Sequence, residues 1–240
     1  VFAEAIRAAG AMTILLKDAI MPNVLQTVEH VPAFVHAGPF ANIAHGNSSI
    51  LADEIALRCA DYVVTEAGFG ADMGFEKFCD IKCRISGHHP DAAVLVVTVR
   101  ALKAHSGRYR VVPGRPIDPT IFEPSVEAVH AGLPNMVKHL ENIARFNLPC
   151  VVAVNRFDTD SDDELDVIAE AAKAAGAFDV VISEAHTEGG AGAAAMAEAV
   201  VAAAESPRPE PFRFLYDLEL PIREKIDTIA RTIYGADGVD

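Results

Sequence analysis

Residues 148–183 read LPCVVAVNRFDTDSDDELDVIAEAAKAAGAFDVVIS, and this stretch decides the fold class. Its two apolar runs, residues 150–154 and 180–183, are short and rich in valine, which is typical of strands buried on both faces. Between them, residues 162–175 begin with acidic side chains and end at Gly176, as a capped helix does. Strand, helix and strand in this order predict a parallel sheet with crossover helices.

The same alternation extends along most of the chain. Further strands are predicted at residues 33–37, 62–65 and 92–99. Further helices are predicted at residues 1–28 up to the break at Pro22, and at residues 48–59 behind an Asn47 or Ser48 cap, 123–146, 191–205 and 218–234. We therefore expect an α/β fold with a doubly wound, mostly parallel sheet. Two proline-rich stretches interrupt it, an extended loop at residues 106–124 and a semi-rigid linker at residues 206–211.

Composition excludes several classes of function. The 240 residues include 20 basic and 34 acidic side chains, a formal charge of −14, which argues against a nucleic-acid or anionic membrane partner. No apolar run reaches the length of a membrane-spanning helix, and the first residues lack the order of a signal peptide. The four cysteines form no Cys-x-x-Cys pair, so we expect reduced thiols in a cytoplasmic protein and no metal site.

Ligands of open α/β sheets bind at the carboxyl ends of the strands, so the residues after each strand are the candidates. The first predicted strand leads into a loop that contains Asn42 and His45 and ends at a helix N-terminus, which favours an anion. After the second come Glu66, suited to Mg²⁺ or a catalytic water, and the residues Gly68, Phe69 and Gly70, where a phosphate can approach the backbone. A turn with a helix cap explains either loop equally well, and the glycine spacing also resembles, weakly, a dinucleotide fingerprint.

The later strand ends are polar too. Arg100 and Lys103 follow the third strand and suit an anionic substrate, although a pair of surface charges is the plainer interpretation. Asn155 and Asp160 follow the fourth, where an amide and a carboxylate could recognise a purine or simply form a turn. The fifth strand runs into the polar, glycine-rich residues 183–190. Five polar strand ends together indicate a ligand more strongly than any one of them.

Three longer motifs resemble the formate–tetrahydrofolate ligase family: KDAIMPN at residues 17–23, FVHAGPFANIAHGNSS at 34–49 and VTEAGFGAD at 64–72. The resemblance covers essentially the whole chain. It implies a fold related to P-loop NTPases, ATP and Mg²⁺ as cofactors, and an often homo-oligomeric enzyme. It also implies a reaction in which formate attacks the γ-phosphate and the resulting formyl phosphate formylates tetrahydrofolate.

The resemblance implies roles for individual residues as well. Glu66 matches an acidic position of the Walker B type, and Gly68, Phe69 and Gly70 match the lining of the nucleotide or phosphoryl intermediate. Asn155 and Asp160 match a family segment in which Arg156 replaces the usual lysine. We therefore expect His45, Glu66, Arg100 and Lys103 in catalysis or phosphate contact. The expected nucleotide- or phosphate-binding residues are Asn42, Gly68, Phe69, Gly70, Asn155 and Asp160.

Departures from the family pattern set a second expectation. The chain has no Gly-Lys dipeptide, hence no phosphate loop, and His186 stands where a tryptophan is common. We expect an internal fragment: residues 1–30 a helical segment, 31–205 the nucleotide-binding core, and 206–240 a linker and helix leading onward. Alone it is expected to be inactive. The alternatives are a truncated nucleotide- or folate-binding module without catalysis and, third, a dehydrogenase.

Overall fold

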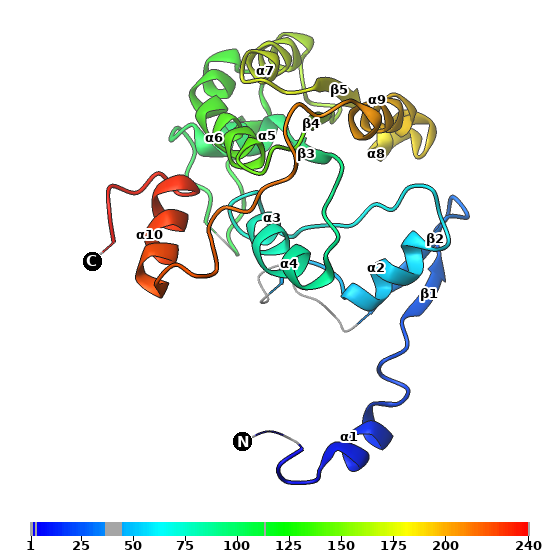
Figure 1. Ribbon diagram of the computed structural model, residues 1–240. Coiled ribbons are helices and arrows are strands. Elements are labelled where there is room, and N and C mark those ends of the chain that lie inside the picture. Colours follow the sequence, from blue (N-terminus) through cyan, green and yellow to red (C-terminus); the bar gives the residue numbers. More distant parts are fainter. Residues whose placement is uncertain (1, 3, 37–44, 113, 240) are drawn as a thin grey trace. The chain divides into compact units, whose positions relative to one another are not determined.

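The computed structural model describes residues 2, 4–36, 45–112 and 114–239 (Figure 1). The chain divides into two compact units, Val1–Gly87 and His88–Asp240. The division expected from the sequence, into residues 1–30, 31–205 and 206–240, remains a prediction.

The second unit is built on a three-stranded parallel sheet in the order β3 (Ala93–Val97), β4 (Cys150–Asn155), β5 (Asp179–Ser183). Helices α6 (Val126–Ala144) and α7 (Asp162–Ala174) pack on one side of this sheet, and α9 (Ala194–Glu205) packs on the other (Figure 1). Central β4 is buried from Cys150 to Val154, as its valine-rich sequence predicts. The parallel strands and the helices on both faces confirm the α/β prediction for this part of the chain.

Helix α6 shows how the core is filled. Ser125 caps its N-terminus by accepting a hydrogen bond from the Ala128 N–H (3.3 Å). The buried residues that follow recur at steps of three and four and form one apolar stripe facing the core: Val129, Leu133, Met136, Leu140 and Ile143. On the other face of the sheet, Val151 packs against Ala199 and Ala203 of α9.

Shorter elements complete the second unit. They are α5 (Val99–His105), the 3₁₀ turn η2 (Pro119–Phe122), α8 (Ala185–Glu188), the 3₁₀ turn η3 (Ala191–Ala193) and α10 (Ile222–Thr232). The predicted strand at residues 92–99 ends earlier than expected, at Val97. Thr98 caps α5 by accepting a hydrogen bond from the Ala101 N–H, and the residues beyond it are helical. Arg100 and Lys103 consequently lie one turn apart on a helix rather than at a strand end.

The proline-rich stretch at residues 206–211 is anchored to the second unit. Arg208 forms an ion pair with Asp91 (2.7 Å), and Asn147 donates a hydrogen bond to the Pro211 carbonyl (2.9 Å). Directly after it, the Phe212 ring stacks on His89 with 5.0 Å between centroids. The stretch is thus held by side chains of the segments that lead into β3 and β4.

The first unit departs from the sequence predictions. It contains α1 (Ala9–Leu16), an antiparallel hairpin of β1 (Asn23–Gln26) and β2 (Pro32–Val35), and α2 (Ile50–Leu57). A continuous helical stretch follows, made of α3 (Gly74–Lys77), the π-helical turn η1 (Phe78–Lys82) and α4 (Cys83–Ser86), and ends at Gly87 in the left-handed conformation. Ser49, rather than Asn47 or Ser48, caps α2.

Two strand predictions in this unit differ from the structure. Residues 33–35 form a strand as predicted, and residue 37 lies outside the described residues, but the expected place in the parallel sheet is wrong: among the described residues β2 pairs with β1 in an antiparallel hairpin, because the segment after Pro22 turns back on itself. Residues 62–65 form no strand, and Val64 is exposed there. An apolar run becomes a strand only where a neighbouring backbone supplies hydrogen bonds, which its own residues do not reveal.

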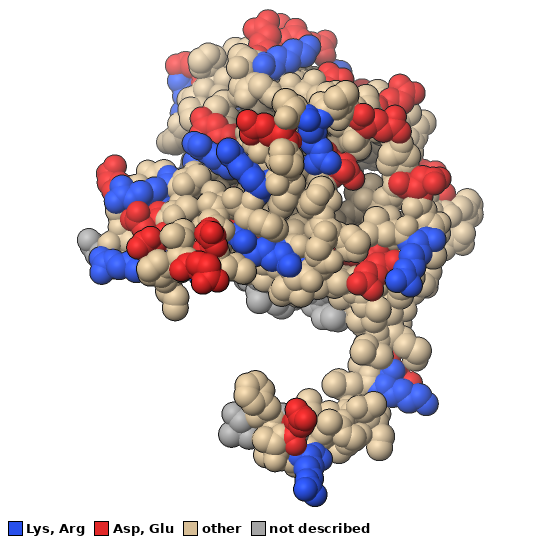
Figure 2. Space-filling model, viewed as in Figure 1, with Lys and Arg blue, Asp and Glu red and all other residues tan. Residues whose placement is uncertain are grey.

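Among the described residues, no helix combines the length and apolarity needed to cross a membrane. On the face shown in Figure 2, basic and acidic side chains are interspersed, without a broad basic patch. All four cysteines are free, and only Cys59 is exposed.

Candidate functional site

The predicted site residues fall into both units. His45, Glu66, Gly68, Phe69 and Gly70 belong to Val1–Gly87. A second group belongs to His88–Asp240 and consists of Arg100, Lys103, Asn155 and Asp160. Asn42 lies outside the described residues.

The glycines of the first unit pack backbone against backbone. The Gly68 N–H donates to the Gly46 carbonyl (3.2 Å), and the Gly74 N–H donates to the Gly68 carbonyl (3.1 Å). A Cβ on Gly46, whose φ is +82°, would lie 2.0 Å from the Gly74 carbonyl oxygen, so no larger residue fits without displacing that backbone. Phe69, between Gly68 and Gly70, has a positive φ of 65° and is 75% exposed, and Glu66, three residues earlier, is exposed as well.

Side-chain interactions that include the buried Lys82 and Asn47 support the segment before Glu66. The Lys82 ammonium lies 2.5 Å from Asp53 and donates to Asn47 Oδ1 (2.8 Å). Asn47 in turn donates to Thr65 Oγ1 (3.3 Å), directly before Glu66. Neither Asn47 nor Lys82 was predicted as a site residue, because Asn47 has the pattern of a helix cap and a lysine one residue from a cysteine carries no signal of burial.

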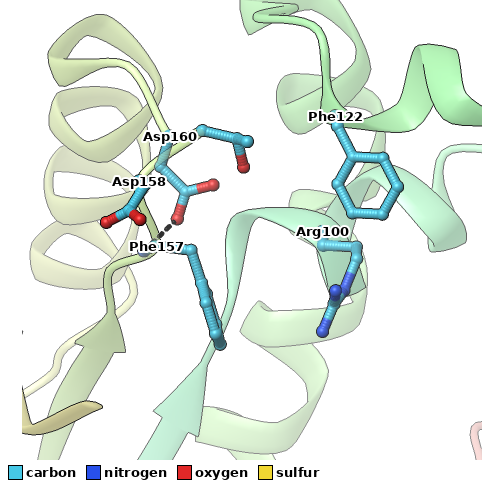
Figure 3. Close-up of a pocket in the computed structure, with 6 residues that line it drawn as sticks. Arg100, Phe122, Phe157, Asp158 and Asp160 are labelled. Atoms are coloured by element: carbon cyan, nitrogen blue, oxygen red, sulfur yellow. Dashed lines mark hydrogen bonds between the residues drawn. The ribbon is translucent and has the colours of Figure 1, made fainter. Parts of the chain in front are cut away.

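The second unit contains a pocket of about 210 Å³ at the carboxyl ends of β3 and β4. Six residues line it: Arg100, Phe122, Phe157, Asp158, Thr159 and Asp160 (Figure 3). The turn after β4 is closed by the Phe157 N–H, which donates to Asp160 Oδ2 (2.9 Å). Because β3 and β4 are parallel neighbours, their two ends bring Arg100 and Phe157 together, as the sequence pattern predicts for such ends.

Arg100 is the cation of this pocket. Its guanidinium carbon lies 5.4 Å from the centroid of the Phe157 ring and 5.8 Å from that of Phe122, within the range of cation–π attraction. The side chain remains exposed, so its N–H groups stay available to an anionic ligand. Burial raises the pKa of Asp160 above its ordinary value, and the hydrogen bond from Phe157 offsets part of that rise.

A smaller hollow of about 120 Å³ shares two lining residues with this pocket. It is lined by Arg156, Phe157, Asp158, Glu184, Thr187 and Glu188. The Phe157 ring also meets the His186 ring at 5.2 Å and a tilt of 47°. Phe157 and Asp158 therefore belong to the walls of both hollows.

Lys103 and Asn155 line neither hollow. The Lys103 ammonium is buried, lies 2.6 Å from Glu164 Oε1, and donates to the Glu123 carbonyl (2.9 Å). Asn155 ends β4 beside Ser183 of β5. In the part of the chain that the structure describes, no three His, Cys, Asp or Glu side chains form a set able to hold a metal ion.

Comparison with known proteins supplies the family. The model of the formate–tetrahydrofolate ligase family matches residues 1–240. The chain belongs to this family.

The sequences of individual ligases align with this chain along its whole length. The formate–tetrahydrofolate ligase of Roseiflexus castenholzii is 58% identical over 240 residues, all of this chain and 42% of the ligase. That of Saccharopolyspora erythraea is 57% identical over 239 residues, again 42% of its length, and that of Chloroflexus aggregans is 51% identical over 240. The chain spans about two fifths of the length of these relatives.

Several residues in and around the pocket of this formate–tetrahydrofolate ligase family member were not among the predicted site residues, Phe122, Phe157 and Glu164 among them. Phe122 comes from the proline-rich loop, where no periodic pattern marks a residue as a pocket wall. Phe157 was not predicted, although an aromatic residue between Asn155 and Asp160 was the available signal. Glu164 reads as an ordinary capping residue of α7, and only the structure shows its partner Lys103.

Proposed function

We propose that the chain forms part of an ATP-dependent enzyme that makes 10-formyltetrahydrofolate from formate and tetrahydrofolate through formyl phosphate. The family match over residues 1–240 carries this proposal. The relatives are named formate–tetrahydrofolate ligases, a name that includes both formate and tetrahydrofolate. ATP, a cytoplasmic location, a homo-oligomeric state and a fold related to P-loop NTPases belong to the same proposal, the last supported by the parallel sheet with helices on both faces.

The pocket of the second unit supports a role in binding one part of a substrate. At about 210 Å³ it is smaller than the 300–1,000 Å³ of typical ligand sites, so it suits a single ring or anionic group. The rings of Phe122 and Phe157 offer stacking surfaces, and the Arg100 guanidinium offers charge and paired N–H donors. Phosphoryl transfer depends mainly on positioning and on neutralising charge, which is the role we assign to Arg100.

The remaining predicted residues keep narrower roles in the proposal. His45, Glu66 and the loop of Gly68, Phe69 and Gly70 offer an imidazole, a carboxylate and an exposed ring to the nucleotide. Asn155 and Asp160 shape the turn beside Arg100. Lys103 is assigned to its ion pair with Glu164 rather than to phosphate. Mg²⁺ would neutralise nucleotide phosphates, and we assign no residue of this chain to the ion.

A chimeric enzyme tests the proposal. The matching 240 residues of the Roseiflexus castenholzii ligase are replaced by this chain, and formate-dependent ADP release and 10-formyltetrahydrofolate formation are measured. We expect the chimera to be active and to depend on both formate and tetrahydrofolate, while the 240-residue chain alone releases no ADP. A folded chimera that binds nucleotide but forms no product would favour the non-catalytic module instead.

A further inference from the structure

The buried ion pair of Lys103 and Glu164 connects the walls of the Arg100 pocket without lining it. The two side chains are 2% and 0% exposed, with 2.6 Å between Lys103 Nζ and Glu164 Oε1. Two charges withdrawn from water this completely need several further hydrogen bonds to be held. Those bonds run to three different parts of the second unit.

Glu164 accepts from donors on two helix caps besides the lysine. Its Oε1 accepts from the Ser125 N–H at the start of α6 (2.7 Å), and its Oε2 accepts from the Ser161 N–H and Oγ–H at the start of α7 (both 3.0 Å). In an ordinary capping box, the acidic side chain accepts a hydrogen bond only from the N-cap residue of its own helix. Here one carboxylate fixes α5, α6 and α7 to one another.

Each wall of the pocket lies next to one of these bonds. Arg100 is one turn before Lys103 on α5, and Phe122 directly precedes Glu123, whose carbonyl accepts from Lys103 (2.9 Å). On the opposite wall, Asp160 directly precedes Ser161. Figure 3 shows Arg100 and Phe157 projecting into the same space from different elements.

We propose that Glu164, through its ion pair with Lys103, is a positioning residue that sets the separation between Arg100 and the Phe157–Asp160 turn. Glu164 is not one of the residues that line the pocket, so its effect on the pocket passes through α5 and the two helix caps. Two apolar side chains in place of Lys103 and Glu164 would fill the same space. Without hydrogen bonds, however, they would not fix the orientation of α5 relative to the caps of α6 and α7. This inference rests on the proposed function only for its kinetic consequences, since the geometry itself can be measured without any activity.

The geometric test uses the full chain labelled with ¹⁵N-arginine. We expect the Arg100 Nε–H signal, assigned by its loss in Arg100→Lys, to be shifted by the nearby rings of Phe122 and Phe157. In Glu164→Gln we expect this signal to move towards the position of a solvent-exposed arginine. The matched control is Glu170→Gln, an exposed carboxylate on the same helix, which should leave the signal unchanged. An unchanged Arg100 signal in folded Glu164→Gln would overturn the proposal.

The kinetic test uses a double-mutant cycle in the chimera. Glu164→Gln is expected to lower kcat/KM by roughly 10- to 100-fold, the range that small misplacements of a substrate-binding group produce. In an Arg100→Ala background the same change should cost nearly nothing more, whereas a purely structural role would give additive losses. If Glu164→Gln does not fold, Lys103→Met with Glu164→Leu removes both charges together and takes its place. Full additivity in either case would refute the positioning role, whereas an inactive unsubstituted chimera would count against the proposed function alone.

Discussion

Arg100 combines an exposed position with two aromatic neighbours, which makes its contribution to function separable from its contribution to folding. We expect Arg100→Ala to lower kcat/KM of the chimera by roughly 10- to 100-fold, since hydrogen bonds to a charged group are worth about 1.5–3 kcal/mol. Arg100→Lys should recover only part of the loss, because an ammonium lacks the planar, paired donors. Melting temperature and steady-state kinetics are the measurements. Arg223→Ala, an exposed arginine on α10, is the control, and a loss as large there would contradict the assignment.

Arg100 and Lys103 also show what a residue's neighbours in sequence can reveal. Both were predicted as cations facing an anionic ligand, and as residues three apart they do share one face of α5. Of the two, only Arg100 lines the pocket. Lys103 instead forms a buried ion pair with Glu164, which is sixty-one positions later in the sequence. The strand end could be found from the local pattern, whereas the partner of a buried charge depends on packing between distant segments.

At the scale of elements, the close crossing of α5 and α6 depends on Gly132. A Cβ at this position would lie 2.0 Å from the Leu102 carbonyl oxygen of α5. We expect Gly132→Ala to lower the free energy of unfolding by about 1–3 kcal/mol, since the two helices must move apart. Gly10→Ala in α1 is the matched control: nothing lies within 4 Å of its Cβ, so it should gain up to about 1 kcal/mol from helix propensity. Urea denaturation of both variants checks this, and equal effects would argue against the close contact.

The helical stretch from Gly74 to Ser86 contains a carboxyl group that titrates near neutral pH. Burial and the neighbouring Asp80 raise the pKa of Glu76 from 4.5 to about 7. Below pH 4.5 the group is protonated in both states. Between pH 4.5 and 7 the unfolded chain loses the proton while the folded chain keeps it, so the free energy of unfolding should fall as the pH rises through this window.

In Glu76→Gln, the free energy of unfolding should no longer fall as the pH rises from 4.5 to 7. At pH 8 the variant should be more stable than the original chain by up to about 3 kcal/mol, the equivalent of a shift of this size. Thermal unfolding of both proteins between pH 4 and 8 is the measurement, with Glu54→Gln on α2 as the control. Parallel pH profiles for the original chain and Glu76→Gln would show that the carboxyl is not held in its neutral form.

The strand predictions succeed in the parallel sheet, although its three strands are buried to different degrees. Central β4 is apolar and buried from Cys150 to Val154, the pattern of a strand covered on both faces, whereas β3 and β5 carry similar valine-rich runs and are partly exposed. Residues 62–65 carry the same kind of pattern but have no strand beside them in the described structure. Hydrogen-bonding partners come from elsewhere in the chain, so the apolar run alone could not distinguish the two cases.

At the scale of the whole molecule, the core is divided unequally between the two units. Among the described residues, six buried hydrophobic side chains belong to Val1–Gly87 and twenty-four to His88–Asp240. Helix α1 and strand β1 bury no residue at all. Because stability follows the apolar surface that is buried, the first unit should be the less stable one.

We therefore expect unfolding in two steps, with the first unit opening at lower urea concentration. Hydrogen exchange measured by mass spectrometry at increasing urea resolves the two units directly. Phe78→Ala and Phe146→Ala remove one buried ring each, from the first and the second unit, and each loss is worth about 3–5 kcal/mol. The first variant should advance only the exchange of Val1–Gly87, and the second only that of His88–Asp240. A single transition that both variants shift alike would mean that the two units unfold as one cooperative body, in which the larger core stabilises the smaller.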